Sequence, residues 1–239
     1  MVEEITLTGL ALGLLPAVVV IAIMLRWSAG PGTAIYATIR MLVQLLLIGY
    51  VLVFIFEAQQ PAIIAGVLVV MLAFASWIAI RPVARKHTHV FRNALLAISA
   101  GGILVLALVT QVVIAVEPWF NPRYVVPLAG MVFAGAMNSV SLAAERLEAE
   151  IGRNASIGEA RRIALSAALI PIINSLFAVG LVALPGMMTG QILSGVSPLI
   201  AAKYQIVVMS MLFGVSGLSA ALYLQLQTYR AQRSNLPNG

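Results

Sequence analysis

Seven long apolar runs limit what this chain can fold into more than any other feature of its sequence. A helix needs about 20 mostly apolar residues to cross the hydrocarbon core of a bilayer. Only 9% of the 239 residues are charged, whereas about 25% is usual in globular domains. We predict an all-α integral membrane protein, built as one transmembrane domain over residues 1–239. Its seven predicted spans are approximately Ile5–Leu25, Ile35–Phe56, Pro61–Ile80, Asn93–Val116, Val126–Ala144, Ile163–Leu184 and Tyr204–Gln227.

The basic residues predict the orientation of these spans. Cytoplasmic loops are enriched in Lys and Arg, and the loops on one side hold eleven such residues, against at most two on the other side. We predict a multi-pass protein of the inner (plasma) membrane, with its N-terminus outside and its C-terminus in the cytoplasm. Topology and lipid headgroups explain the net charge of +6, so no nucleic-acid partner is expected. Because Glu3 and Glu4 replace the basic start of a signal peptide, the first run should remain as a span.

Several residue types that power membrane proteins are absent from the predicted spans. All eight acidic residues are Glu, and none falls inside a span, where proton-coupled carriers usually hold carboxylates. His87 and His89 fall in a basic loop, where solvated histidines are better supported than a metal-binding pair. The sequence has no Cys and no Gly-x-x-x-x-Gly-Lys-Ser/Thr phosphate loop. We therefore expect no enzyme and no cofactor bound by this chain, but a pathway protein that is passive or driven by a partner.

The segment ERLEAEIGRNASIGEARR, residues 145–162, is the candidate contact with such a partner. Ser156 followed by Glu159 is typical of a helix start, because each side chain can satisfy a free amide of the first turn. We predict a short amphiphilic helix on the cytoplasmic face, suited to a groove on a partner; a merely solvated loop is equally well supported. The candidate coupling residues are Glu150, Arg153, Ser156, Glu159, Arg161 and Arg162.

Polar and sulfur-containing side chains inside the spans are the candidate pathway residues. Arg40 and Gln44 lie one helical turn apart, although an arginine near a span end more often snorkels to the interface. Amides and hydroxyls inside spans either bond across helices or line a wet path. Thioethers can bind soft ions, but they more often fill the core. The remaining candidates are Met131, Met137, Asn138, Asn174 and Ser175.

The stretch VGLVALPGMMTGQILSGVSP interrupts the apolar pattern with four glycines and two prolines. Pro185 and Gly186 should end or kink the sixth span. We predict an outer re-entrant or interfacial hairpin over residues 185–203, in which glycines such as Gly186 and Gly190 allow close backbone approach. A structural turn that packs two helices is an equally supported alternative. The candidate gate residues are Pro185, Gly186, Met187, Met188, Gly190 and Gln191.

Three segments carry a family resemblance: PLAGMVFAGAM, ALIPIINSLFAVGLVALPGMMTGQILSGVSP and KYQIVV. They resemble the FetB-type permease family of bacterial ABC transporters, which is linked to iron export. Plant relatives of that family include half-transporters associated with aluminium tolerance and UDP-glucose transport. The resemblance implies a homodimer of permeases with two separately encoded ATP-binding subunits, and export of iron. A passive channel, a scaffold, or a permease for another metal or a nucleotide sugar stay open as alternatives.

The chain departs from the family pattern at a point that bears on the substrate. Some relatives carry an acidic residue and a lysine where this chain has Asn174 and Phe177. Iron and similar cations prefer anionic oxygen ligands, whereas the neutral Asn174 side chain offers only a carbonyl oxygen.

Overall fold

The protein is described by a computed structural model that covers residues 5–57, 60–83 and 88–234. These residues form helices joined by turns, with no β-strand among them. Seven helical stretches within them are long and apolar enough to cross a membrane, which confirms the predicted all-α class with seven spans. Their orientation stays a prediction, and Glu3, Glu4, Arg85, Lys86 and His87 lie outside the described residues.

The chain divides into two compact units, residues 1–57 and 58–239. The first unit contains α1 (Leu7–Gly13), α2 (Leu15–Arg26) and α3 (Pro31–Glu57). Thr6 caps α1, since its Oγ1 accepts a hydrogen bond from the Gly9 amide at 3.1 Å. Gly30, with a φ of 65°, lets the chain turn before Pro31 begins α3. Ile55 is the only buried side chain among the described residues of this unit. The apolar side chains of the unit are therefore mostly exposed, which suits a lipid environment.

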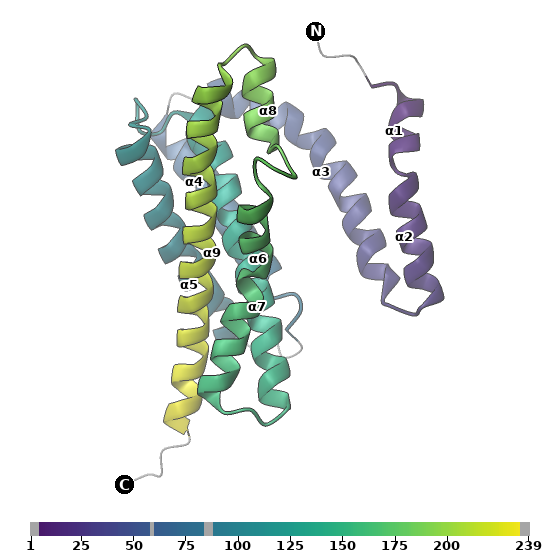
Figure 1. Ribbon diagram of the computed structural model, residues 1–239, viewed down its shortest axis with the longest axis vertical. Coiled ribbons are helices and arrows are strands. Elements are labelled where there is room, and N and C mark those ends of the chain that lie inside the picture. Colours follow the sequence, from purple (N-terminus) through teal and green to yellow (C-terminus); the bar gives the residue numbers. More distant parts are fainter. Residues whose placement is uncertain (1–4, 58–59, 84–87, 235–239) are drawn as a thin grey trace. The chain divides into compact units, whose positions relative to one another are not determined.

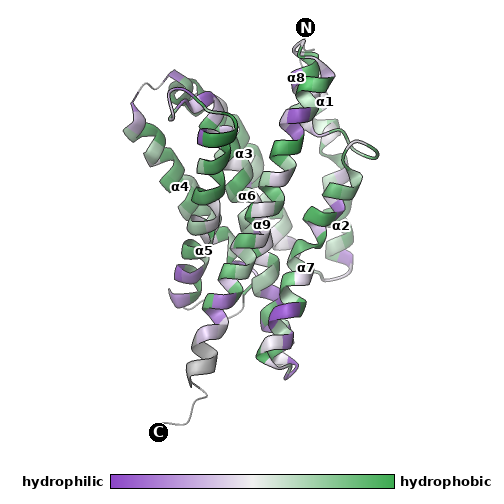
Figure 2. Cartoon of the chain, turned by 60° about the vertical axis from the view of Figure 1, so that its left-hand side comes forward, coloured by the Kyte–Doolittle hydropathy of each residue, from purple (hydrophilic) through white to green (hydrophobic). Residues whose placement is uncertain are grey.

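The second unit holds the core. It contains α4 (Pro61–Ala79), α5 (Thr88–Ala107), the π-helical turn η1 (Leu108–Val113), α6 (Pro122–Gly152), α7 (Ile157–Ala178), α8 (Gly186–Leu193) and α9 (Pro198–Ser234). The central helix α6 packs against α4, α5, α7 and α9, while α8 packs against α9. The α6–α7 turn and the C-terminal end of α9 lie at one end of this unit, and α8 lies at the other (Figure 1). Hydrophobic residues follow most of α4, and hydrophilic residues gather toward the ends of α5 and α7 (Figure 2).

Small residues let the helices of this unit approach closely. A Cβ at Gly101 of α5 would collide with Oγ of Ser219 on α9 and would lie 3.2 Å from the Ser219 amide nitrogen. A Cβ at Gly102 would lie 2.9 Å from Cε1 of Phe133 on α6. Such packing matters in lipid, where helices gain little from the hydrophobic effect on association. The close approach expected at Gly186 and Gly190 is not found, because a Cβ at either position would meet nothing within 4 Å.

Several predicted helix ends are wrong by several residues. Helix α6 continues to Gly152, so most of the predicted 145–162 loop is helical, and the expected short surface helix is instead the start of α7. Ala, Glu, Leu and Arg are strong helix formers, so AAERLEAE extends the helix beyond its apolar part. Helix α7 ends at Ala178, shortly before Gly180 takes a φ of 82°. Pro198 begins α9, so the last residues of the predicted 185–203 hairpin are already part of this helix, since proline suits a first helical turn.

Candidate functional site

A cavity of about 350 Å³ lies among α6, α7 and α9; we call it the α7 cavity. Helix α7 is buried through Ala160, Ala164 and Ala168, which lie one helical turn apart. The part of α7 that follows Ala168 is mostly exposed, and the cavity lies beside this part. The Ser139 and Ser175 hydroxyls donate to carbonyls of their own helices, Gly135 O and Pro171 O, at 2.9 Å each. The α7 cavity is lined by Met131, Ala134, Gly135, Asn138, Ser139, Leu142, Ala168, Pro171, Ile172, Ser175, Leu212 and Ser216.

A larger cavity of about 610 Å³ lies among α6, α8 and α9; we call it the α8 cavity. Helix α8 contributes to its wall because α7 ends at Ala178 and a new short helix begins after Pro185, its N-cap residue. The Gln191 Oε1 atom is buried and has no hydrogen-bond partner among the described residues. The α8 cavity is lined by Ile114, Arg123, Tyr124, Pro127, Leu128, Met131, Met187, Gln191, Val196, Ile200, Tyr204, Val207 and Val208.

Met131 lines both cavities. Its half-buried side chain is on α6, the helix that the two cavities share, and it packs against the core. Methionine is unbranched and flexible, so it can change rotamer without disturbing the backbone. The two cavities therefore lie in series along α6, with one movable side chain at their common wall.

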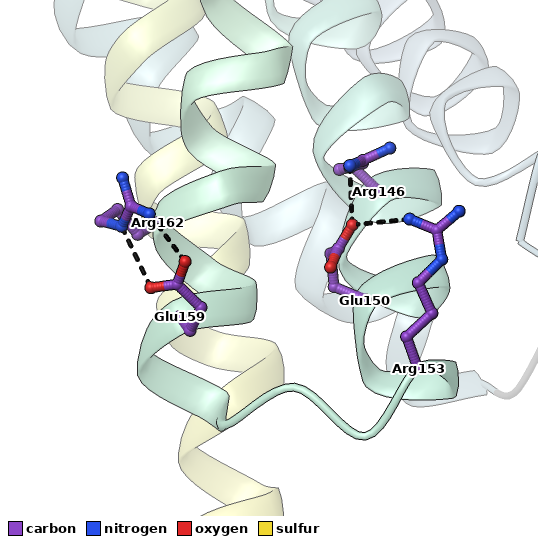
Figure 3. Close-up of polar contacts among 5 residues, drawn as sticks. All are labelled: Arg146, Glu150, Arg153, Glu159 and Arg162. Carbon is purple, nitrogen blue, oxygen red and sulfur yellow. Dashed lines mark hydrogen bonds and ion pairs between the residues drawn. The ribbon is translucent and has the colours of Figure 1, made fainter.

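Charged residues gather at the α6–α7 turn, the end of the unit opposite α8 (Figures 1 and 3). The Glu150 carboxylate is 8% exposed and accepts from Arg146 Nη2 at 2.7 Å and Arg153 Nη1 at 3.1 Å. On α7, Arg162 donates Nη2 to Glu159 Oε1 at 2.6 Å and Nε to Glu159 Oε2 at 3.2 Å. The side chains of Arg153 and Arg162 stay 66% and 71% exposed, so this turn presents ion-paired charges of both signs at its surface.

The sequence of this turn determines its shape. Asn154 takes a φ of 62°, a left-handed conformation that asparagine tolerates well, and this ends α6. Two residues later Ser156 begins α7, and its Oγ accepts a hydrogen bond from the Glu159 amide at 3.3 Å, as predicted. Arg161 Nη1 donates to Gln225 Oε1 at 2.6 Å, which ties the start of α7 to α9.

The Ser156 cap makes a stability prediction. Ser156→Ala removes the hydroxyl that accepts a hydrogen bond from the Glu159 amide, and it should lower the free energy of unfolding by about 1 kcal/mol. Thermal unfolding of the purified protein in detergent would measure this change. Ser156→Asp keeps an acceptor at the same position and should unfold like the wild type; equal losses in both variants would argue against the cap.

Comparison with known proteins identifies the family. Residues 7–231 match the model of a family described as "Uncharacterised protein family (UPF0014)". The chain belongs to this family. It is 36% identical over 228 residues to a UPF0014 membrane protein of Synechocystis, covering 88% of this chain and 87% of the relative. No solved structure matches the chain.

Two further UPF0014 relatives carry descriptive names. The protein is 34% identical to "Protein ALUMINUM SENSITIVE 3" of Arabidopsis thaliana, covering 85% of this chain and 80% of the relative. It is 32% identical to "Probable iron export permease protein FetB" of Escherichia coli, covering 95% and 92% of the two chains. Family membership and the seven apolar helices together make this UPF0014 chain a multi-pass membrane protein.

The structure brings some of the predicted pathway residues of this UPF0014 protein together and separates others. Met131, Asn138 and Ser175 meet in the α7 cavity. Met137 packs against the core, and Asn174 is exposed on α7 without lining either cavity. Arg40 and Gln44 lie one turn apart on α3, in the other unit of the chain.

The predicted gate residues divide in the same way. Met187 and Gln191 line the α8 cavity. The other four predicted gate residues do not line the α8 cavity. They are Pro185, which is the N-cap of α8, and Gly186, Met188 and Gly190, which lie on α8 itself. Insertion of the 185–203 segment into the membrane stays a prediction.

Sequence reasoning missed several cavity residues. Arg123 and Tyr124 belong to the stretch NPRY between two predicted spans, and neither was a candidate site residue. Ser216 lines the α7 cavity from the middle of α9. Ser216 lies one helical turn after Leu212, so the two share a face of the predicted span, and this was the only sign that it could line a cavity. An isolated serine in a span, however, usually donates a hydrogen bond to a backbone carbonyl of its own helix. Among the described residues, no three His, Cys, Asp or Glu side chains gather as a metal site, and His87 lies outside those residues.

Proposed function

We propose that this UPF0014 membrane permease is the membrane-spanning subunit of an ATP-driven ABC exporter. The observation that carries the proposal is the arrangement of the second unit: two cavities in series along α6, with an exposed charged turn at the opposite end from α8. The cavities give a solute a place to bind. The turn gives a separate protein a charged surface through which to move α6 and α7.

The energy source in this proposal is a partner subunit. The sequence has no phosphate loop, so ATP would bind and react on a separate ATP-binding chain. Two copies of the permease would pair with two such subunits. The charged α6–α7 turns would lie in the cytoplasm of the cell, and α8 would lie on the outer side of the plasma membrane. This orientation follows the excess of Lys and Arg in the loops on that side.

Iron is the proposed substrate, because one relative covered over 92% of its length carries the name of a probable iron export permease. Cells that lack this chain should retain more iron after exposure to excess iron, as measured by elemental analysis. Unchanged iron together with a changed level of another metal or of a nucleotide sugar would contradict the iron assignment and leave the exporter class in place.

The exporter class is tested by purifying the chain together with the ATPase encoded nearest to it. The expected result is a stable complex whose ATP hydrolysis exceeds that of the ATPase alone. Flux through proteoliposomes that contain only this chain, without nucleotide, would instead support a passive channel. A scaffold would give neither flux nor stimulated hydrolysis.

The charged α6–α7 turn supplies a sharper variant for the same assay. Arg162→Glu reverses an exposed charge and breaks the pair with Glu159, so it should reduce the stimulation of ATP hydrolysis while the permease itself stays folded. Arg162→Lys keeps the charge and should retain most of the stimulation. Equal stimulation of ATP hydrolysis by wild type and by Arg162→Glu would show that Arg162 does not contribute to the contact with the ATPase.

A further inference from the structure

The α8 cavity has an unusual balance of charge for the pathway of a metal cation. Arg123 is the one charged side chain among the described residues that line it, and no carboxylate lines either cavity. No ion pair joins the Arg123 guanidinium to an acidic residue within the described part of the chain. A bare divalent cation in this cavity would meet a positive charge and no anionic ligand, although Ca²⁺, Mg²⁺ and similar ions prefer anionic oxygens.

The neutral groups of the cavity are suited to an oxygen-rich ligand. Gln191 brings an amide whose buried Oε1 has no partner among the described residues. This oxygen is an acceptor, so a hydroxyl, a protonated phosphate or water would satisfy it, whereas the Nε2 group can donate to anionic oxygens. Tyr124 and Tyr204 add two phenol groups, each able to donate a hydrogen bond. The positive end of α6, which begins at Pro122, lies at the same wall as Arg123.

The size of the α8 cavity matches a small molecule. Its volume of about 610 Å³ lies within the range of about 300–1,000 Å³ that is typical of ligand pockets. Guanidinium groups bind carboxylates and phosphates through paired, charge-assisted hydrogen bonds, whereas they repel cations.

We propose that the α8 cavity binds a small soluble anion with carboxylate or phosphate oxygens, with Arg123 as its charged anchor and Gln191 as a neutral hydrogen-bonding partner. This inference rests on the proposed function in one respect: if the protein exports a metal, the metal passes this cavity as an anionic chelate and not as a bare cation. The anion-binding site itself requires no partner subunit.

Equilibrium dialysis of the purified full chain in neutral detergent, without any ATPase, tests the site. The probes are radiolabelled citrate, pyrophosphate, ferric citrate and free Fe²⁺. At least one of the first three should bind wild type with measurable affinity, and Arg123→Gln should weaken that binding by about ten- to a hundredfold. Arg123→Lys keeps the charge and should retain part of the affinity. Arg81→Gln removes an exposed arginine that lines neither cavity and should bind like wild type.

A second variant separates an anion site from a cation site. Gln191→Glu is nearly isosteric and places a negative charge at the position of the Gln191 amide. It should abolish binding of citrate and pyrophosphate, whereas in a cation site the same change would tighten binding of Fe²⁺. Thermal unfolding of each variant establishes that it is folded.

Three results would overturn the proposal. The first is that no anionic probe binds wild type more tightly than it binds Arg123→Gln. The second is that free Fe²⁺ binds wild type and Gln191→Glu binds it more tightly still. The third is that purified protein retains phosphatidylglycerol in an Arg123-dependent manner while soluble anions do not compete, which would assign the cavity to a lipid headgroup. Each of these outcomes leaves stimulated ATP hydrolysis untouched, so the exporter proposal stands or falls separately.

Discussion

Met131→Trp should reduce transport by about tenfold or more while the protein stays folded, because the width of a constriction controls passage through a membrane pathway. Met131 lines both the α7 and the α8 cavity. A thioether chain at this wall can swing aside, whereas the rigid indole ring is larger and would occupy the space on either side. The neighbouring cavity volume of about 350 Å³ gives the ring room without displacing the backbone.

Two conservative variants serve as controls for this result. Met131→Leu keeps the volume and should leave transport near the wild-type level, with a stability change below about 1.5 kcal/mol. Met137→Leu changes a half-buried methionine of the same helix that lines neither cavity, and it should also be nearly neutral. Transport and thermal unfolding are measured together for all three. Wild-type transport by a folded Met131→Trp protein would contradict a path through the two cavities.

Gly101→Leu should prevent α5 and α9 from packing, which makes it the most damaging substitution that the fold suggests. Any Cβ at this position collides with Ser219 Oγ and lies 3.2 Å from the backbone nitrogen of Ser219, which cannot turn aside as a flexible side chain could. Even Gly101→Ala should lower the free energy of unfolding by about 1–3 kcal/mol, as overpacked cores do.

Gly66→Ala is the matched control. Gly66 lies on α4, and a Cβ there would meet nothing within 4 Å. The same chemical change should therefore be neutral or stabilise the helix by up to about 1 kcal/mol, since alanine is the better helix former. The midpoint of thermal unfolding in detergent should fall for Gly101→Ala and should stay unchanged or rise for Gly66→Ala. A loss of similar size at both positions would mean that Gly101 has no special packing role.

The membrane spans could be predicted because bilayer thickness imposes a fixed length on an apolar helix. The helix cap at Ser156 could also be predicted, since it depends only on two residues that are three apart in sequence. Helix ends were harder to predict. The apolar signal stops at Ala144, but the α6 backbone continues through strong helix formers to Gly152.

Residues that meet in a cavity depend on how helices rotate against one another, and sequence alone does not determine this. Asn138 and Asn174 were equal candidates by composition, yet only Asn138 lines the α7 cavity. Met131 and Met137 are likewise separated by their rotation around α6. Arg123 lies between two predicted spans, and nothing in its neighbourhood indicates that it lines a cavity together with α8, more than sixty residues later.

The most direct test of the central proposal, an ATP-driven permease, is transport into inside-out membrane vesicles that contain this chain and its ATPase. Radioactive iron would be supplied in parallel as free Fe²⁺ and as ferric citrate. We expect accumulation that requires ATP and both subunits, and that is lost when the ATPase cannot hydrolyse ATP. Accumulation that is equal without nucleotide, or without the ATPase, would contradict the proposal.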